Sequence, residues 1–145
     1  MTNISRRILI FSDGGARGNP GPAAIAFLAL SENGQSLMQH SDYLGCRTNN
    51  QAEYEALIAG LRFALDKCVD EVVCYLDSQL VTKQLNGEYA VKNFELNRLW
   101  MKVQDLKKGF KKISFISLPR SNPHIETVDR LLNERLDREL KSRCN

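Results

Sequence analysis

Residues 8–24 read ILIFSDGGARGNPGPAA, an apolar run that ends at Asp13 and enters a turn rich in glycine and proline. A glycine-rich turn after a strand often binds phosphate at the N-terminus of a following helix. This stretch lacks the lysine and the serine or threonine of a P-loop, and residues 23–30 are too apolar and proline-bounded to begin an amphipathic helix. The stretch therefore predicts a strand over residues 8–12, a wide turn and a second strand over residues 23–30, with Asp13 at the end of the first strand.

Length and composition are those of an ordinary globular domain. The chain has 145 residues, 43% hydrophobic and 26% charged, and we expect residues 1–145 to form a single domain around one core. No apolar run approaches the roughly 20 residues that span a bilayer, so we expect no membrane association. The run after Arg6 and Arg7 breaks at Asp13, which favours a strand over a signal peptide. We therefore expect a cytoplasmic protein. We also expect a monomer.

The cysteines stand far apart in the sequence. None forms a C-x-x-C pair, which argues against a zinc site and for separate thiols. A disulfide to the near-terminal Cys144 is the alternative. The four cysteines are Cys46, Cys68, Cys74 and Cys144.

Basic residues gather in one part of the chain. The net charge of +3 is too small to indicate a nucleic-acid partner by itself, but between residues 98 and 112 only Asp105 is acidic. Such a cluster either binds phosphates or forms a solvated helix face, and the sequence leaves both interpretations open. This basic cluster consists of Arg98, Lys102, Lys107, Lys108, Lys111 and Lys112.

Hydrophobic periodicity predicts an α/β fold. A hairpin signal at residues 32–34 makes the first three strands an antiparallel meander. A helix over residues 51–67 then leads to a strand that ends before Asp77, and this order implies a right-handed crossover with the first and fourth strands parallel. We expect a five-stranded mixed sheet, three antiparallel strands then two parallel, with helices on both faces. The other expected elements are strands 36–44, 72–76 and 113–118 and helices 79–85, 94–108 and 125–141.

Asp13 and Asp77 both stand at the carboxyl end of an expected strand. If the two parallel strands are neighbours, the carboxylates lie side by side at the sheet edge where open α/β sheets bind ligands. The alternative is that each aspartate merely begins a turn, because Asp followed by Gly or Ser is a common turn or cap signal.

Glu53 is a third candidate for a functional carboxylate. Asn50 and Glu53 have the spacing of a capping box, which is the structural alternative. Helical spacing nevertheless places Glu53 on the face of Leu57, toward the core, whereas Glu55 points away. A carboxylate on a buried face needs a counterion, because an unpaired buried charge is too costly to keep ionised.

Asp129 repeats this pattern on the last expected helix, where it shares an apolar stripe with Leu132, Leu136 and Leu140. No lysine or arginine stands at matching positions to neutralise these carboxylates. Carboxylates that converge without basic partners repel one another, and a hard divalent cation with oxygen ligands relieves the repulsion. Two Mg²⁺ ions, or Mn²⁺, about 4 Å apart would suit phosphodiester hydrolysis, as in two-metal nucleases and polymerases.

The same residues carry a resemblance to the type 1 ribonuclease H family. The resemblance covers nearly the whole chain and lies in the stretches FSDGGARGNPGPAA, TNNQAEYEALIAGL, YLDSQLVTKQLNGEYAVKN and VDRLLNERLD, each in the expected order and on the expected element. It implies a ribonuclease H-like fold and hydrolysis of the RNA strand of an RNA–DNA hybrid, with 5′-phosphate and 3′-hydroxyl products. It also implies that the metal-binding catalytic carboxylates are Asp13, Glu53, Asp77 and Asp129.

The resemblance further implies how a hybrid duplex would bind. The turn after Asp13 and the residues that begin the first helix would face the minor groove and contact RNA 2′-hydroxyls, which distinguish RNA from DNA. Thr48 and Asn49 resemble residues that hold a phosphate of the DNA strand, although plain helix capping also explains them. The implied substrate contacts are Gly14, Gly15, Asn19, Thr48, Asn49, Asn50, Gln51 and Ser78.

The chain departs from the family pattern before its last carboxylate. Many members carry a histidine in a mobile loop there, thought to assist product release, and an asparagine shortly before the carboxylate. Here the loop reads PRSNPHIETVD, with Asn122 and His124 at different spacings. His124 is a candidate for this catalytic role in product release, and the alternative is an idle surface histidine. Arg120 is a candidate substrate contact, and the alternative is an ordinary exposed arginine. The chain also lacks room for a basic handle between its middle helices, so hybrid affinity would rest on the basic cluster.

Two alternatives stay open at this point. In the first alternative, the chain is a relative that cuts other duplexes, such as double-stranded RNA or DNA. In the second, it is a hybrid-binding domain without turnover. Retention of all four carboxylates argues against the second alternative.

Overall fold

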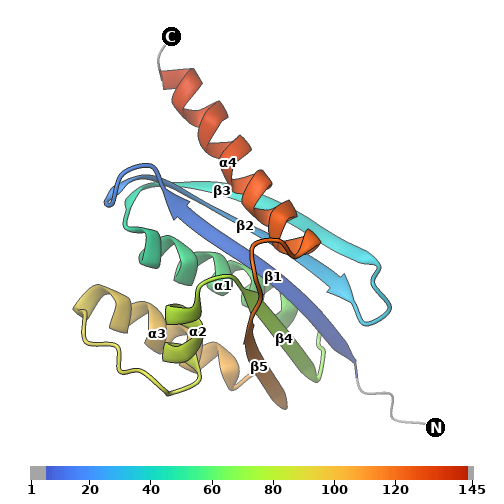
Figure 1. Cartoon of the computed structure of the whole chain (residues 1–145). Coiled ribbons are helices and arrows are strands. Elements are labelled where there is room, and N and C mark those ends of the chain that lie inside the picture. The colour runs from blue at the N-terminus through green and yellow to red at the C-terminus, as the bar shows by residue number, and fades with distance from the viewer. Residues whose placement is uncertain (1–5, 144–145) are drawn as a thin grey trace, which may run out of the picture.

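The computed structural model describes residues 6–143, which form a five-stranded sheet and four helices (Figure 1). The strand order is β3-β2-β1-β4-β5. β1 pairs antiparallel with β2, and β2 with β3, whereas β1–β4 and β4–β5 are parallel. The predicted mixed sheet is therefore confirmed. The elements are β1 (Arg7–Ala16), β2 (Gly21–Ser31), β3 (Ser36–Arg47), α1 (Asn49–Leu65), β4 (Glu71–Leu76), α2 (Gln79–Leu85), α3 (Phe94–Lys107), β5 (Lys112–Ser117) and α4 (Pro123–Arg143).

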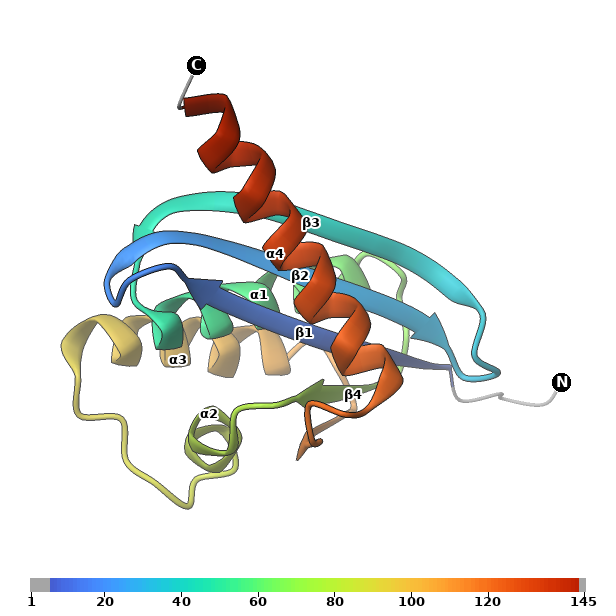
Figure 2. The same ribbon diagram turned by 45° about the horizontal axis from the view of Figure 1, so that its top comes forward.

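The sheet separates two apolar layers. Ile10 of β1 packs in the layer that contains Leu57 of α1, whereas the next residue, Phe11, packs in the layer that contains Ile125 of α4. This alternation follows from the two-residue period of a strand. Figure 2 shows α4 across one face of the sheet and α1 and α3 behind the other. The expectation of helices on both faces is confirmed.

Two helices begin earlier than the sequence predicts. Helix α1 begins at Asn49 because Thr48 is its N-cap and forms a capping box with Gln51, so the alternative interpretation of Glu53 as a capping-box partner of Asn50 is wrong. Either pair satisfies the sequence signature of a capping box, and the structure contains the earlier one. Helix α4 begins at Pro123, and its first turn is capped by the side-chain oxygen of Asn122.

Strand β1 extends beyond its parallel neighbour. Its pairing with β4 ends at Phe11 and Tyr75, while β1 itself continues to Ala16. The N-terminal part of α1 crosses this free edge so closely that a Cβ on Gly14 would collide with the carbonyl of Ala52. Glycine at this position therefore allows the helix to approach the strand just beyond Asp13.

The described cysteines Cys46, Cys68 and Cys74 are free thiols, as predicted. Cys144, the partner in the alternative disulfide, lies outside the described residues. Within residues 6–143, no helix is both long and apolar enough to cross a bilayer.

Candidate active site

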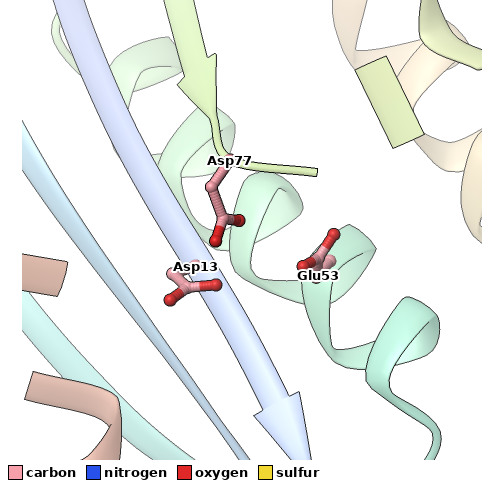
Figure 3. Close-up of side chains that lie close together, drawn as sticks. All are labelled: Asp13, Glu53 and Asp77. Atoms are coloured by element: carbon pink, nitrogen blue, oxygen red, sulfur yellow. The ribbon is translucent and has the colours of Figure 1, made fainter. Parts of the chain in front are cut away.

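Three carboxylates meet at the free edge of β1. Asp13, Glu53 and Asp77 each offer one oxygen, and these oxygens lie within 4.8 Å of one another. Figure 3 shows Asp13 on β1, Asp77 just after β4 and Glu53 on α1, with the three side chains gathered in one place. The predicted convergence of Asp13 and Asp77 follows directly from the parallel pairing of their strands.

Burial makes this carboxylate trio electrostatically unfavourable. Asp13 is 4% exposed. Its burial, and then the charges of Asp77, Glu53 and Asp129, raise its pKa from 3.8 to about 9. Burial, followed by the charge of Asp77, raises the pKa of Glu53 from 4.5 to about 7, although a hydrogen bond with Ser78 opposes the change. The carboxyl of Asp13 therefore retains its proton at neutral pH unless a cation compensates its charge.

Two oxygens of the trio suit a hard cation. Among the described residues, the buried Oδ2 of Asp13 and Oε2 of Glu53 have no hydrogen-bond partner. Buried acceptors without a donor are costly, and oxygen-only ligand sets are what Mg²⁺, Mn²⁺ and Ca²⁺ bind. The donor set therefore fits a divalent metal ion.

Asp129 lies beside the trio rather than within it. It projects from α4 into a cavity of about 360 Å³ that Asp13 and Glu53 also line. Its charge contributes to the raised pKa of Asp13, and its Oδ1 accepts a hydrogen bond of 3.3 Å from Asn133 Nδ2. The half-buried position on the apolar face of α4 agrees with the helical spacing in the sequence.

The prediction that no basic residue partners these carboxylates is wrong. Arg120 Nε donates to Asp77 Oδ2 at 3.0 Å, and its charge lowers the pKa of Asp13 and Glu53. Arg120 comes from the loop after β5, and β5 is the parallel neighbour of β4, so its approach depends on loop geometry rather than on spacing within one element. Arg120 also lines the cavity that contains Asp13 and Asp129.

The turn after β1 and the start of α1 are joined by asparagine side chains. Asn49 Oδ1 accepts from the backbone N–H of Ala16 at 2.8 Å, and Asn19 Oδ1 accepts from the backbone N–H of Asn49 at 3.0 Å. Gly15 and Asn49 line the same cavity as Asp13, Glu53 and Asp129. Gly14 lines it too but is buried against α1, so its placement has a packing reason.

The remaining predicted contacts hold the ends of helices. Thr48 Oγ1 accepts from Gln51 N–H at 3.2 Å, while Gln51 Oε1 accepts from Thr48 N–H at 2.9 Å. Asn50 follows in the first turn and is half-buried. Ser78 caps α2 through its Oγ, which accepts from Val81 N–H at 3.1 Å.

His124 lies in the first turn of α4 rather than in a loop. Its ring packs against Phe11 with the ring centroids 4.7 Å apart, and Phe11 in turn stacks on Tyr75. The residue is exposed, but it does not line the cavity that contains Asp13, Glu53 and Asp129. The structure therefore gives His124 a defined packing partner two residues before Asp13 in β1.

The predicted basic cluster is divided between two places. Arg98 and Lys102 line a second cavity of about 410 Å³ next to the start of α1. Lys111 and Lys112 instead form ion pairs with Asp70 and Glu71, at the opposite end of β4 from Asp77.

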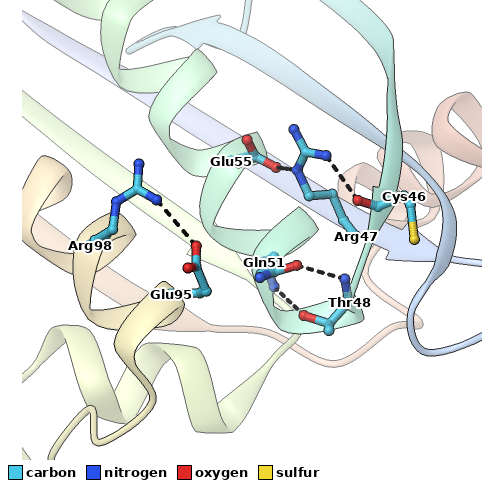
Figure 4. Close-up of polar contacts among 7 residues, drawn as sticks. All are labelled: Cys46, Arg47, Thr48, Gln51, Glu55, Glu95 and Arg98. Carbon is cyan, nitrogen blue, oxygen red and sulfur yellow. Dashed lines mark hydrogen bonds and ion pairs between the residues drawn. The ribbon is translucent and has the colours of Figure 1, made fainter.

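Sequence reasoning missed Arg47, which lines the second cavity beside Gln51. Figure 4 shows Arg47 paired with Glu55 and Arg98 paired with Glu95 on either side of the capping box. The position of Arg47 next to Thr48 was the available signal.

The sheet order and the carboxylate trio together define a protein of the ribonuclease H fold. Comparison with known proteins agrees. The family model described as reverse transcriptase-like matches residues 11–125. Ribonuclease HI of Halobacterium salinarum is 41% identical over 131 residues, which is 90% of this chain and 65% of that protein. The chain thus spans just under two thirds of that relative, and about a third (36%) of a similar bifunctional protein of Mycobacterium tuberculosis.

Solved structures extend the likeness to nearly complete chains. The RNase H1 of Halobacterium salinarum is 41% identical with a TM-score of 0.86, covering 90% of this chain and 98% of its own. The N-terminal RNase H domain of the Mycobacterium tuberculosis protein is 35% identical with a TM-score of 0.90, covering 95% and 99%. LC11-RNase H1, solved in complex with an RNA/DNA hybrid, is 40% identical with a TM-score of 0.86, covering 92% and 99%. The chain belongs to the type 1 ribonuclease H family.

Proposed function

We propose that this protein is an endonuclease that hydrolyses the RNA strand of RNA–DNA hybrids, leaving 5′-phosphate and 3′-hydroxyl ends. The observation that carries the proposal is the trio of Asp13, Glu53 and Asp77 within 4.8 Å, with a buried oxygen left unpartnered on both Asp13 and Glu53. Family membership and the hybrid bound by LC11-RNase H1 support the choice of substrate.

Four carboxylates would hold the metal ions. Asp13, Glu53 and Asp77 form the centre, and Asp129 completes the set from α4. Two Mg²⁺ ions, with Mn²⁺ as the alternative, would activate a water and stabilise the leaving oxygen of the phosphodiester. The rigid sheet edge fixes Asp13 and Asp77, so these ligands are positioned before a substrate arrives.

Asn19 and Asn49 would read the minor groove of the hybrid. Their side-chain oxygens are already used, by Asn49 N–H and Ala16 N–H respectively, which fixes both amide groups. Their Nδ2 groups donate no hydrogen bond within residues 6–143 and therefore remain available to a 2′-hydroxyl, which accepts as well as donates. Thr48, Asn50, Gln51, Ser78 and Arg120 stay predicted substrate contacts, and His124 a predicted catalytic residue.

The test compares duplexes and one matched pair of variants. The intact protein with Mg²⁺ should cut the labelled RNA strand of a hybrid and leave matched double-stranded RNA and DNA intact. Asp77→Asn should abolish cleavage, because it removes a central ligand. Asp105→Asn is the control, since Asp105 is exposed on α3 and pairs with Lys108. Efficient cutting of double-stranded RNA or DNA would instead indicate a relative that acts on other duplexes. Hybrid binding without cleavage would indicate a hybrid-binding domain without turnover. Equal loss in both variants would contradict the assignment of the site.

The cytoplasmic location and the monomeric state remain predictions. Fractionation of the source cells and light scattering of the purified protein would test them.

A further inference from the structure

Arg120 is the cation that faces the carboxylate trio. Its Nε lies 3.0 Å from Asp77 Oδ2, and the two side chains differ sharply in exposure, at 77% for Arg120 and 8% for Asp77. The buried member of this ion pair is thus fixed by the end of β4, while the cationic member reaches inward from solvent on a short loop. Breaking this ion pair would therefore move a side chain that already lies largely in solvent.

A second arginine, Arg17, lines the cavity that Arg120 shares with Asp13, but it has other partners. Arg17 forms an ion pair of 2.6 Å with Asp137 and donates to the backbone oxygen of Asn133 at 3.3 Å. Among the described residues that line this cavity, Arg120 is therefore the cation engaged by a carboxylate of the trio. Arg120 also interacts with more than one carboxylate: its hydrogen bond with Asp77 and then the charge of Asp77 raise the pKa of Arg120, and the charges of Asp13 and Asp129 raise it further.

The ion pair occupies one of the two oxygens that Asp77 could offer to a metal ion. Asp77 Oδ2 is committed to Arg120 Nε, whereas Asp13 Oδ2 and Glu53 Oε2 are without partners. An arginine and a divalent ion cannot share the same side of a carboxylate oxygen at close range, because their charges repel. A metal ion on Oδ2 would have to displace Arg120, and one on the other oxygen of Asp77 would still be repelled by the guanidinium, so metal binding at Asp77 competes with the ion pair.

We propose that Arg120 is a built-in counter-cation of the trio, which competes with a divalent metal ion for Asp77 and is released when the metal binds. This inference rests on the proposed function, because it takes Asp77 as a metal ligand. The released guanidinium stands at the rim of the cavity, where its planar donors suit a phosphate oxygen of the bound duplex. Arg120 thus lowers the affinity of the trio for metal while keeping its charge balanced before the metal arrives.

The experiment measures Mn²⁺ affinity by isothermal titration calorimetry on the whole protein without nucleic acid. Arg120→Gln should bind Mn²⁺ about two- to fivefold more tightly than the unmodified protein, the range expected for losing one ion pair whose arginine is largely exposed. Arg120→Lys keeps the charge but not the planar donor geometry, and should give a smaller gain. Arg17→Gln is the matched control, because it removes a cation from the same cavity without touching the trio, and should change the affinity less than twofold.

Thermal unfolding supplies a second readout. Without metal, Arg120→Gln should unfold at a lower temperature than the unmodified protein, because Asp77 loses its counterion. Saturating Mn²⁺ should then raise the unfolding temperature of Arg120→Gln more than that of the unmodified protein. A stability loss that Mn²⁺ does not recover would show that the ion pair is merely structural.

Failure of this inference is distinguishable from failure of the proposed function. If the unmodified protein binds Mn²⁺ and cuts a hybrid while Arg120→Gln has unchanged affinity, or an affinity equal to that of Arg17→Gln, the competition is refuted and the function stands. If the unmodified protein neither binds Mn²⁺ nor cuts a hybrid, the proposed function itself fails.

Discussion

Asp13→Asn should stabilise this protein when divalent metal is absent. The Asp13 carboxyl has a pKa of about 9 in the folded chain against an ordinary value of 3.8, chiefly because it is buried and secondly because Asp77, Glu53 and Asp129 surround it. Between these two pH values, the unfolded chain has lost the proton while the folded chain keeps it. Stability is therefore greatest below pH 4 for this group and falls as the pH rises toward 9.

The size of the effect follows from this difference. At pH 7, keeping the proton on Asp13 costs about 4 kcal/mol as an upper bound, at about 1.4 kcal/mol for each pH unit above 3.8. Asparagine has nearly the same shape and does not titrate, so it avoids this cost. For a domain of this size, an upper bound of about 4 kcal/mol corresponds to roughly 10 °C in the unfolding temperature.

The assay is urea or thermal unfolding in EDTA at pH 5, 7 and 9. The stability difference between Asp13→Asn and the unmodified protein should grow as the pH rises across this range. Saturating Mg²⁺ should stabilise the unmodified protein strongly and the variant weakly, since metal binding displaces the proton. A variant that is less stable than the unmodified protein at pH 7 in EDTA would refute the reasoning and identify Asp13 as a structural residue.

Three further outcomes are expected. Gly14→Ala should lower the free energy of unfolding in urea by roughly 3 kcal/mol or more, because the added Cβ meets the Ala52 carbonyl. Gly15→Ala is the control and should be tolerated, since the nearest contact of its Cβ is a Leu132 methyl at 3.6 Å. Equal losses in the two variants would show that the close crossing of α1 over β1 is not the cause. Hybrid affinity should fall as the salt concentration rises. Replacing Arg98 and Lys102 by glutamine should lower the slope of log affinity against log salt concentration by about 2, more than replacing Lys111 and Lys112. The reverse order would place the duplex at the other end of the sheet. His124→Ala should slow turnover more than it weakens hybrid binding, and unchanged steady-state kinetics would make it an idle surface residue.

The strand pairing and the meeting of two of the carboxylates could be predicted from the sequence because simple rules place them. A strand–helix–strand crossover makes β1 and β4 parallel, and this alone brings Asp13 and Asp77 to the same sheet edge. Glu53 and Asp129 were found from helical spacing, since each stands on the face of its helix that turns toward the core.

The rest depended on geometry that periodicity does not encode. The contact of Arg120 with Asp77 joins residues 43 apart through a loop, where no repeat fixes the side-chain direction. The capping signature fits both Thr48–Gln51 and Asn50–Glu53, so the signature alone does not decide where the helix begins. Similarly, the basic cluster is continuous in sequence but divided in space, because the chain reverses between α3 and β5.

The most direct test of the central claim is hybrid cleavage during a titration with Mg²⁺ or Mn²⁺ from an EDTA-treated protein. The carboxylate trio predicts no cleavage in EDTA, recovery as metal is added, and 5′-phosphate and 3′-hydroxyl ends on the RNA fragments. Hybrid cleavage that persists unchanged in EDTA would contradict the assignment of Asp13, Glu53 and Asp77 as ligands of catalytic metal ions.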